Sequence, residues 1–334
     1  MKPLRPTRGK TAEEDAASGI TIGVDLGGTK IQTVAVHDKE VIGGDRVLTP
    51  STNADDVIAA IITAATHAME SAGASLSDLA GVGIGSPGRI DREMGVVSNS
   101  PNVAGFKESV ELGARVSQAL GGVLVRVDND VRVAMLGEHA RGNAAPYSNV
   151  LGVFVGTGVG GGLILDGKLR GGRGAGGEIG HTIVDVDGRM CGDGKRGHLE
   201  AYAGRARMEA RARELVSKGH KTDLFKIMNK KGRERLSSGV FAAALASEDK
   251  MTESLIADAT WALGIALASA QNLLDVEAII IGGGLGDRLG KPFIDGIAAQ
   301  IHPQLIAPDR APDILGTGLG DLSGAVGAAV LAGG

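Results

Sequence analysis

The chain has 334 residues and a formal net charge of −4 at pH 7, and 43% of its residues are hydrophobic. This length can bury the cores of two domains, and the charge balance excludes the strongly basic surface of a nucleic-acid-binding protein. A single cysteine, Cys191, excludes an intrachain disulfide, and no apolar run reaches the roughly 20 residues that a membrane-spanning helix needs. We therefore expect a cytoplasmic protein with small-molecule ligands and no membrane or nucleic-acid partner.

The N-terminal segment and the glycine and aromatic contents are the next features of the composition. The first nineteen residues are polar without an apolar segment, so they are not a signal peptide, and we expect a disordered tail over 1–19. Aromatic residues make up only 2%, so Val, Ile, Leu and Ala must build the core. The 54 glycines cluster after apolar runs, which predicts tight turns at strand ends.

The first half of the chain alternates strands and helices. Residues 20–36 predict a strand, a turn at Gly27 and Gly28, and a second strand, with a further short strand around Val41 and Ile42. A helix follows, with Thr52 or Asn53 as its cap and Gly73 as its end. The next elements are a strand that ends in a turn, a strand that ends on acidic residues and a helix: 79–88, Val123–Asp130 and 131–142.

The opening pattern returns at Leu151. The stretch "LGVFVGTGVGGGLILDG" again predicts strand, glycine turn and strand, roughly 130 residues after the first hairpin, which indicates duplicated halves. Residues from Tyr202 to about Ala270 are predicted to be mostly helical. The last elements are a buried strand followed by a glycine turn and a helix in "VEAIIIGGGLGDRL", and a C-terminal helix of small residues. This alternation predicts an α/β fold.

Four glycine turns could hold phosphate through backbone N–H groups, although each could also be an ordinary tight turn. They are Gly27–Lys30, Gly156–Gly162, Gly282–Gly286 and Gly316–Gly320. The second turn contains a G-x-G-x-x-G match, but a strand follows it instead of the helix that a dinucleotide fold needs. The chain has no G-x-x-x-x-G-K-[ST] motif. These features favour a hairpin turn that wraps phosphate and occurs twice.

Five motifs together resemble the sugar kinase/actin-like superfamily and, within it, the ROK family (repressor, open reading frame, kinase). The resemblance covers the chain from Ile22 to Leu331. The motifs are two phosphate motifs, a catalytic-aspartate motif, the family signature and an adenosine motif: "DLGGTK" (Asp25–Lys30) and "GTGVGGG", "DND" (Asp128–Asp130), "GEIGH" (Gly177–His181) with "GHLEAYAG" (Gly197–Gly204), and "IIIGGGL".

The resemblance implies a fold and a domain organisation. The fold is an α/β, actin-like/hexokinase (ribonuclease H-like) arrangement of two domains with duplicated β-sheets and an interdomain cleft. The expected smaller domain comprises residues 20–130 and 321–334, and the larger domain comprises residues 131–320.

The resemblance also implies ATP-dependent phosphorylation of a hexose, with glucose to glucose 6-phosphate as the first candidate, Mg²⁺ as cofactor and Asp130 as general base. Polyphosphate is the alternative donor. The implied sugar-binding residues are Asn102, Asn129, Asp130, Glu178, His181 and Glu200. The implied nucleotide and phosphate ligands are Asp25, which would also help to place Mg²⁺, and Gly27, Gly28, Thr29, Lys30, Gly156, Thr157, Gly158, Gly160, Gly282, Gly283 and Gly284.

The chain departs from the family in its zinc motif. Many ROK proteins carry one His and three Cys in a pattern like CxCGxxGCxE, whereas this chain has "CGDGKRGHLE". Cys191 and His181 keep two family positions, and Asp193 and His198 replace two cysteines. All four are legitimate zinc ligands. The sequence therefore allows either a substituted structural zinc site or a loop that has lost its metal.

The sequence also allows other substrates and other functions. The substrate could be fructose, mannose, N-acetylmannosamine or N-acetylglucosamine. A ROK sugar-responsive regulator would carry an N-terminal DNA-binding domain, and we expect none here because about twenty polar residues precede the first predicted strand. A non-catalytic, actin-type nucleotide-binding scaffold would not need Asp130. The resemblance implies a homodimer, and we expect the charged segment 218–235 to be a solvated helical face.

Overall fold

The computed structural model describes residues 19–333, which divide into two compact units. The first unit runs to Asp130 and includes Ala328–Gly334, and the second comprises Val131–Gly327. The predicted disordered tail, apart from Gly19, lies outside the described residues. Within the described range, no helix is both long and apolar enough to cross a membrane.

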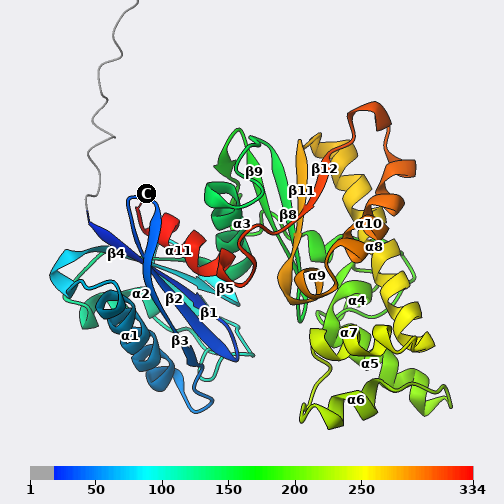
Figure 1. Cartoon of the computed structure of the whole chain (residues 1–334), viewed down its shortest axis with the longest axis horizontal. Helices are drawn as coiled ribbons and strands as arrows, with labels where there is room; N and C mark the ends of the chain where they lie inside the picture. The colour runs from blue at the N-terminus through cyan, green and yellow to red at the C-terminus, as the bar shows by residue number, and fades with distance from the viewer. Residues whose placement is uncertain (1–18, 334) are drawn as a thin grey trace, which may run out of the picture. The chain divides into compact units, whose positions relative to one another are not determined.

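The first unit contains a five-stranded sheet in the order β3-β2-β1-β4-β7 (Figure 1). β1, β2 and β3 pair antiparallel, whereas β4 and β7 extend the sheet in parallel. The strands are β1 (Ile20–Leu26), β2 (Lys30–His37), β3 (Glu40–Leu48), β4 (Leu79–Ser86) and β7 (Val125–Asn129). The other elements are α1 (Ala54–Ser71), α2 (Leu112–Ala119), a 3₁₀ turn (Leu76–Asp78) and the small hairpin β5 (Arg89–Asp91) and β6 (Val96–Ser98).

Helix α1 begins and ends at the residues that the sequence predicts. Asn53 caps it by accepting a hydrogen bond from the Asp56 N–H (2.9 Å), and Gly73 follows its end with a φ of +69°. The third strand, expected as a short one around Val41 and Ile42, is longer and pairs with β2 over Glu40–Leu48. Glycine lets this strand approach α1, since a Cβ at Gly43 would lie 2.5 Å from the Ala68 carbonyl oxygen.

The second unit repeats the same sheet topology in the order β10-β9-β8-β11-β12. β8, β9 and β10 pair antiparallel, and β11 and β12 extend the sheet in parallel. The strands are β8 (Val150–Val155), β9 (Val159–Leu165), β10 (Lys168–Leu169), β11 (Ala278–Gly282) and β12 (Asp313–Gly316). The predicted α/β fold with duplicated sheets is therefore confirmed.

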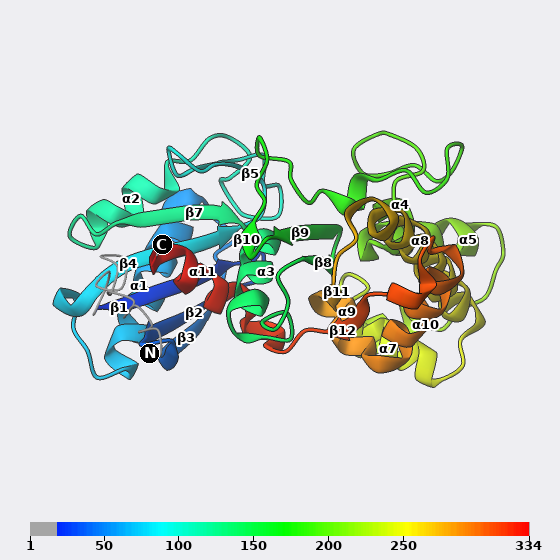
Figure 2. The ribbon, with the colours of Figure 1, turned by 90° about the horizontal axis from the view of Figure 1, so that it is seen from above.

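Side chains of β8 alternate between two cores of the second unit. Leu151, Val153 and Val155 join the larger core, together with residues of the helices that lie on one side of β8 in Figure 2, whereas Val150 and Phe154 pack with Ala134 and Met135 on the other side. The helices of this unit are α3 (Asp130–Arg141), whose first residue belongs to the first unit, α4 (Glu200–Ala203), α5 (Arg205–Ser217), α6 (Leu224–Lys230), α7 (Ser238–Ala246), α8 (Lys250–Leu274), α9 (Gly283–Leu289) and α10 (Lys291–Ile301).

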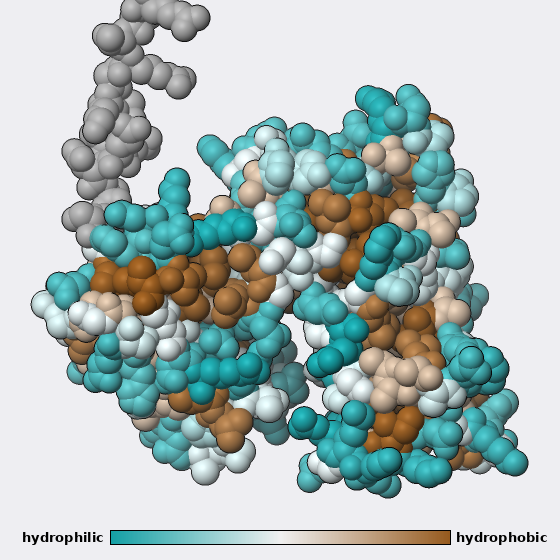
Figure 3. All heavy atoms as spheres, viewed as in Figure 1, coloured by the Kyte–Doolittle hydropathy of each residue, from teal (hydrophilic) through white to brown (hydrophobic). Residues whose placement is uncertain are grey.

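Short 3₁₀ turns and a shared last helix complete the chain. The turns cover Ile179–His181, His302–Gln304, Pro308–Arg310 and Gly320–Leu322, and α11 covers Ser323–Gly333. On the face drawn in Figure 3, hydrophobic residues form separate patches with hydrophilic residues between them.

Two helices begin earlier than the sequence predicts. Asp130, expected at the end of a strand, is the first residue of α3. The glycine turn expected after the strand near residue 280 is shorter, because α9 begins at Gly283. Gly283 has a φ of +79°, and a Cβ there would lie 2.7 Å from the Val155 nitrogen, so the backbone itself requires glycine.

The close packing of β4 on α11 generates a stability prediction. A Cβ at Gly83 would lie 1.8 Å from the Ala328 carbonyl oxygen, and backbone cannot move aside cheaply. We expect Gly83→Ala to lower the free energy of unfolding by about 1–3 kcal/mol. Gly239→Ala in α7 is the matched control, because its nearest atom would be 3.9 Å away. Calorimetric melting of both variants checks this, and an unchanged melting temperature for Gly83→Ala would contradict it.

Candidate active site

The first glycine turn, between β1 and β2, has its carbonyl groups engaged by neighbours. Gly27 N–H donates to the Lys30 carbonyl (2.9 Å) and closes the turn. Thr49, which follows β3, donates its hydroxyl to the Gly27 carbonyl (2.6 Å) and its N–H to the Thr29 carbonyl (3.1 Å). The N–H groups of Gly28 and Thr29 have no acceptor in the described part of the chain. The turn therefore presents two consecutive backbone donors, an arrangement that binds anions.

Gly28 lies against the segment that contains Asn102. A Cβ at Gly28 would lie 2.5 Å from the Asn102 carbonyl oxygen, so this contact requires glycine. Asn102 is exposed in a turn. The structure thus places one predicted sugar-binding residue beside the first predicted phosphate turn.

The second glycine turn, between β8 and β9, has the same property with different partners. Gly156 N–H donates to the Gly158 carbonyl (2.9 Å). The first two N–H groups of α5, from Arg205 and Ala206, donate to the carbonyls of Gly156 (3.1 Å) and Thr157 (3.0 Å). The N–H groups of Thr157 and Gly158 have no acceptor among residues 19–333. This turn also presents two consecutive donors.

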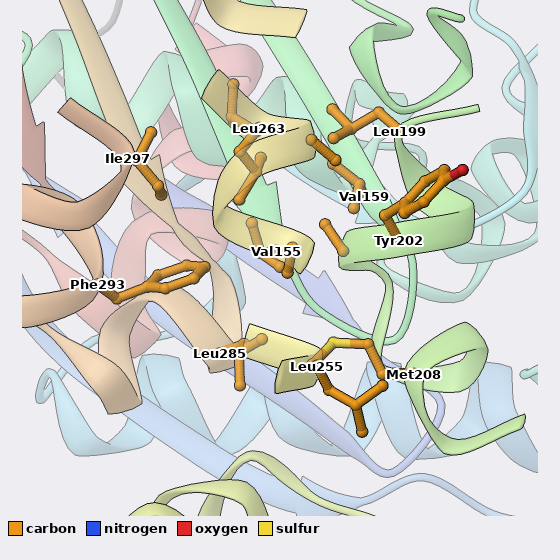
Figure 4. Close-up of a cluster of buried hydrophobic side chains, with 14 of the residues drawn as sticks. Val155, Val159, Leu199, Tyr202, Met208, Leu255, Leu263, Leu285, Phe293 and Ile297 are labelled. Atoms are coloured by element: carbon orange, nitrogen blue, oxygen red, sulfur yellow. The ribbon is translucent and has the colours of Figure 1, made fainter. Parts of the chain in front are cut away.

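Buried residues hold both ends of this second turn. Val155 and Val159 are at most 4% exposed and point into the larger core of the second unit (Figure 4). Val159 N–H donates to Glu200 Oε2 (2.9 Å). Close packing explains the glycines of β9, since a Cβ at Gly160 would lie 2.5 Å from the Val131 side chain. The turn is therefore fixed in shape by its surroundings.

Acidic residues of the first unit lie at one edge of its sheet. β1 and β7 run parallel to β4, and the register aligns Asp25 with Gly85 and Gly85 with Asp128. In open α/β sheets, ligands bind at the carboxyl ends of parallel strands. Asp130 follows at the same end as the first residue of α3, and Asn129 Nδ2 donates to its Oδ1 (3.0 Å).

Asp128 is buried at this edge of the sheet and contacts neighbouring residues through both carboxylate oxygens. The residue is 3% exposed, and its Oδ1 accepts the Asn129 N–H (2.8 Å). Its Oδ2 lies 3.8 Å from the Arg92 guanidinium. These contacts orient the chain as it enters α3, and they suit Asp128 to a structural role.

Four predicted metal ligands lie together in the second unit. The ligand atoms of His181, Cys191, Asp193 and His198 are within 4.8 Å of one another. The two Nδ1 atoms are 3.4 Å apart, and Asp193 Oδ2 lies 3.7 Å from that of His181 and 3.2 Å from that of His198. Ligand atoms of a tetrahedral zinc site are roughly 3.3–3.8 Å apart, so the donor set fits zinc. Burial raises the pKa of the Cys191 thiol, so metal binding there would release a proton.

The loop that carries these ligands is held by Tyr202. Its hydroxyl donates to Asp185 Oδ2 (2.7 Å) and accepts from the Arg189 N–H (3.1 Å). The Arg189 guanidinium lies over the Tyr202 ring and pairs with Asp258 of α8. The loop is therefore anchored to the core helix α8.

Two predicted sugar-binding acids lie beside the four ligands. Glu178 is exposed, and its Oε2 is 3.9 Å from His181 Nε2. Glu200 Oε1 is 3.8 Å from Cys191 Sγ, while its other oxygen accepts the Val159 N–H. Glu200 thus joins the ligand loop to the second glycine turn. In contrast, the last glycine stretch predicted to contact a nucleotide, Gly282–Gly284, runs directly into α9.

Sequence reasoning missed two residues whose side chains form hydrogen bonds with the glycine turns, Thr49 and Arg205. Both act on a turn that is distant in sequence, and neither belongs to a motif. The only available indication was position, since Thr49 follows a strand and Arg205 opens a helix.

The chain is similar to known sugar kinases. The ROK family profile matches residues 21–334. A glucokinase of Streptomyces coelicolor is 34% identical over 94% of this chain and 98% of the relative, and an N-acetyl-D-glucosamine kinase of Erwinia tasmaniensis is 32% identical over 92% and 98%. The crystal structure of a ROK family glucokinase from Streptomyces griseus, in complex with glucose and AMPPNP, is 32% identical, with a TM-score of 0.76 and coverage of 94% of this chain and 99% of that one. The chain therefore belongs to the ROK family.

Proposed function

We propose that the chain transfers the γ-phosphate of ATP to a hexose, with glucose as the first candidate. One observation carries the proposal: each unit holds a glycine turn in which at least two carbonyls accept hydrogen bonds and two consecutive N–H groups have no acceptor in the described part of the chain. Such turns bind phosphate without a lysine or arginine. Membership of the ROK family and the glucokinase relatives support the same activity.

The two turns would hold the phosphates of ATP. Thr29 and Thr157 add a hydroxyl to each pair of backbone donors, and both are exposed. Asp25, half-buried at the end of β1, would hold Mg²⁺ through water. The ion would neutralise phosphate charge, and phosphoryl transfer depends chiefly on such positioning and electrostatic stabilisation.

Asp130 would take the proton from the attacking sugar hydroxyl. A carboxylate is a suitable base, and the amide of Asn129 fixes one of its oxygens (3.0 Å). Acidic residues are favoured in the first turn of a helix, where Asp130 lies. The orientation of the carboxylate is therefore set before substrate binds.

The remaining sugar hydroxyls would meet polar side chains. Hydroxyl-binding sites discriminate strongly, because an analogue without the hydroxyl leaves buried polar groups unpaired. The proposed set is Asn102, Asn129, Glu178, His181 and Glu200.

We also propose that His181, Cys191, Asp193 and His198 hold a structural zinc ion. The donor set and its spacing support this. His181 would use Nδ1 for the metal and keep Nε2, on the side of Glu178, for the sugar. The ion would fix the imidazole ring at the sugar site.

The role of Asp130 predicts the effect of its removal. We expect Asp130→Ala to lower kcat by about 10²–10⁴-fold, because a positioned base contributes that much. Glucose affinity should remain measurable. Asp55→Ala is the matched control, an exposed acid in the first turn of α1. A coupled ADP-release assay measures both, and retention of more than about a tenth of wild-type turnover would exclude Asp130 as the base.

The metal proposal predicts zinc content. Protein purified from zinc-supplemented medium should carry about one zinc per chain, and His198→Ala should lose most of it because three ligands hold the ion poorly. His220→Ala, an exposed histidine outside the cluster, should keep it. Plasma mass spectrometry provides the count. Wild-type protein without zinc under these conditions would refute the proposal.

A sugar panel tests the substrate. We expect the highest kcat/KM for glucose among glucose, fructose, mannose, N-acetylmannosamine and N-acetylglucosamine. The N-acetylglucosamine kinase relative makes that sugar the strongest competitor. ADP release with none of these sugars would contradict the proposed function.

We further propose that the chain forms a homodimer. Light scattering would then report about twice the chain mass of 33.8 kDa.

A further inference from the structure

The side chain of Arg205 reaches the second glycine turn. Its Nη2 donates to Thr157 Oγ1 (3.2 Å), and its Nη1 donates to the Leu236 carbonyl (3.2 Å). Its Nε is buried and has no acceptor in the described part of the chain. Two hydrogen bonds at one end of a planar group fix the plane of the guanidinium.

Glu209, the carboxylate that interacts with Arg205, is already paired with two other arginines. Glu209 is 4% exposed, and its carboxylate already pairs with Arg213 (2.8 Å) and Arg235 (3.0 Å). Burial lowers the pKa of Arg205, Glu209 raises it and Arg235 lowers it. A guanidinium nevertheless stays protonated in proteins. Glu209 therefore interacts with three arginines, Arg205, Arg213 and Arg235.

The hydrogen bond to Thr157 has a consequence for the hydroxyl. A threonine hydroxyl has one proton and two lone pairs, and Arg205 occupies a lone pair. The hydroxyl proton is then directed to another acceptor. The N–H groups of Thr157 and Gly158 are the other donors of this turn. From Gly156 to Gly162 the turn contains no charged residue; Glu200 brings a carboxylate to the Val159 N–H, and Arg205 brings a positive charge to Thr157.

We propose that Arg205 is a positioning residue for the phosphoryl donor: it turns the Thr157 hydroxyl toward a nucleotide phosphate and places a positive charge beside it. This inference rests on the ATP-binding role proposed for the second turn. A purely structural link would be redundant, because the N–H groups of Arg205 and Ala206 already tie α5 to the carbonyls of the turn.

Calorimetric titration of the full chain with AMPPNP, ADP and adenosine tests the proposal. We expect Arg205→Met to weaken the binding of AMPPNP and ADP about tenfold, as for loss of a charge-assisted hydrogen bond, and to leave adenosine binding within about twofold. Arg205→Lys should recover part of the loss, because it restores the charge without the planar fork. KM for ATP should rise while KM for glucose does not.

A double-mutant cycle and a control complete the design. In a Thr157→Val background, Arg205→Met should weaken ADP binding by a smaller factor than in the wild type, because the two side chains act together. Arg211→Met is the matched control on the same helix, where Arg211 pairs only with exposed Glu214 among the ion pairs seen, and it should bind all three ligands normally.

Two results would overturn the inference. One is binding of ADP and AMPPNP by Arg205→Met within about twofold of wild type. The other is equal weakening for adenosine and ADP with a lowered melting temperature, which would mean a structural role. Wild-type protein that binds neither nucleotide would instead contradict the proposed function itself.

Discussion

The structure depends on the way two backbone turns use their hydrogen bonds. Buried or constrained carbonyl groups need donors, and each turn finds them in a neighbouring element. The consecutive N–H groups are then left for a ligand. In the first unit the donors come from Thr49, and in the second they are the opening N–H groups of α5. The two hairpin turns therefore present their N–H groups in the same way, although different elements donate the hydrogen bonds to their carbonyl groups.

Rigidity around the turns follows from the packing. Val155 and Val159 anchor the second turn in a core, and Gly28 of the first turn is pressed against the Asn102 carbonyl. A turn fixed in this way loses little conformational entropy when a phosphate binds. Glu200 extends the effect, since one carboxylate contacts both the second turn and Cys191 of the ligand loop. Glu200 therefore links the second glycine turn to the loop that carries Cys191.

Local patterns made much of the fold predictable. Alternating β-branched residues around a glycine turn revealed both hairpins, and Asn53 marked the start of α1. The beginning of α9 was not predictable, because it depends on the close approach of Gly283 to Val155. The length of β3 was not predictable either, because the strand contains Gly43 and Gly44. Glycine normally weakens a strand, but here both residues pair with β2.

Some residues of the candidate site were predictable from the sequence, and others were not. Motif residues, including the four grouped residues proposed to bind zinc, could be named from the sequence because their spacing is local or family-specific. Thr49 and Arg205 could not, because only tertiary structure brings them to a turn. The hydrogen bond from the Val159 N–H to Glu200 was not predictable for the same reason, because the two residues are 41 positions apart in the sequence.

Amide NMR spectra recorded during titration with Mg²⁺–AMPPNP test the central claim most directly. The account predicts that the N–H resonances of Gly28, Thr29, Thr157 and Gly158 shift with AMPPNP and stay in place with adenosine, because only phosphate reaches these donors. Saturating AMPPNP binding that leaves all four resonances unmoved would contradict it.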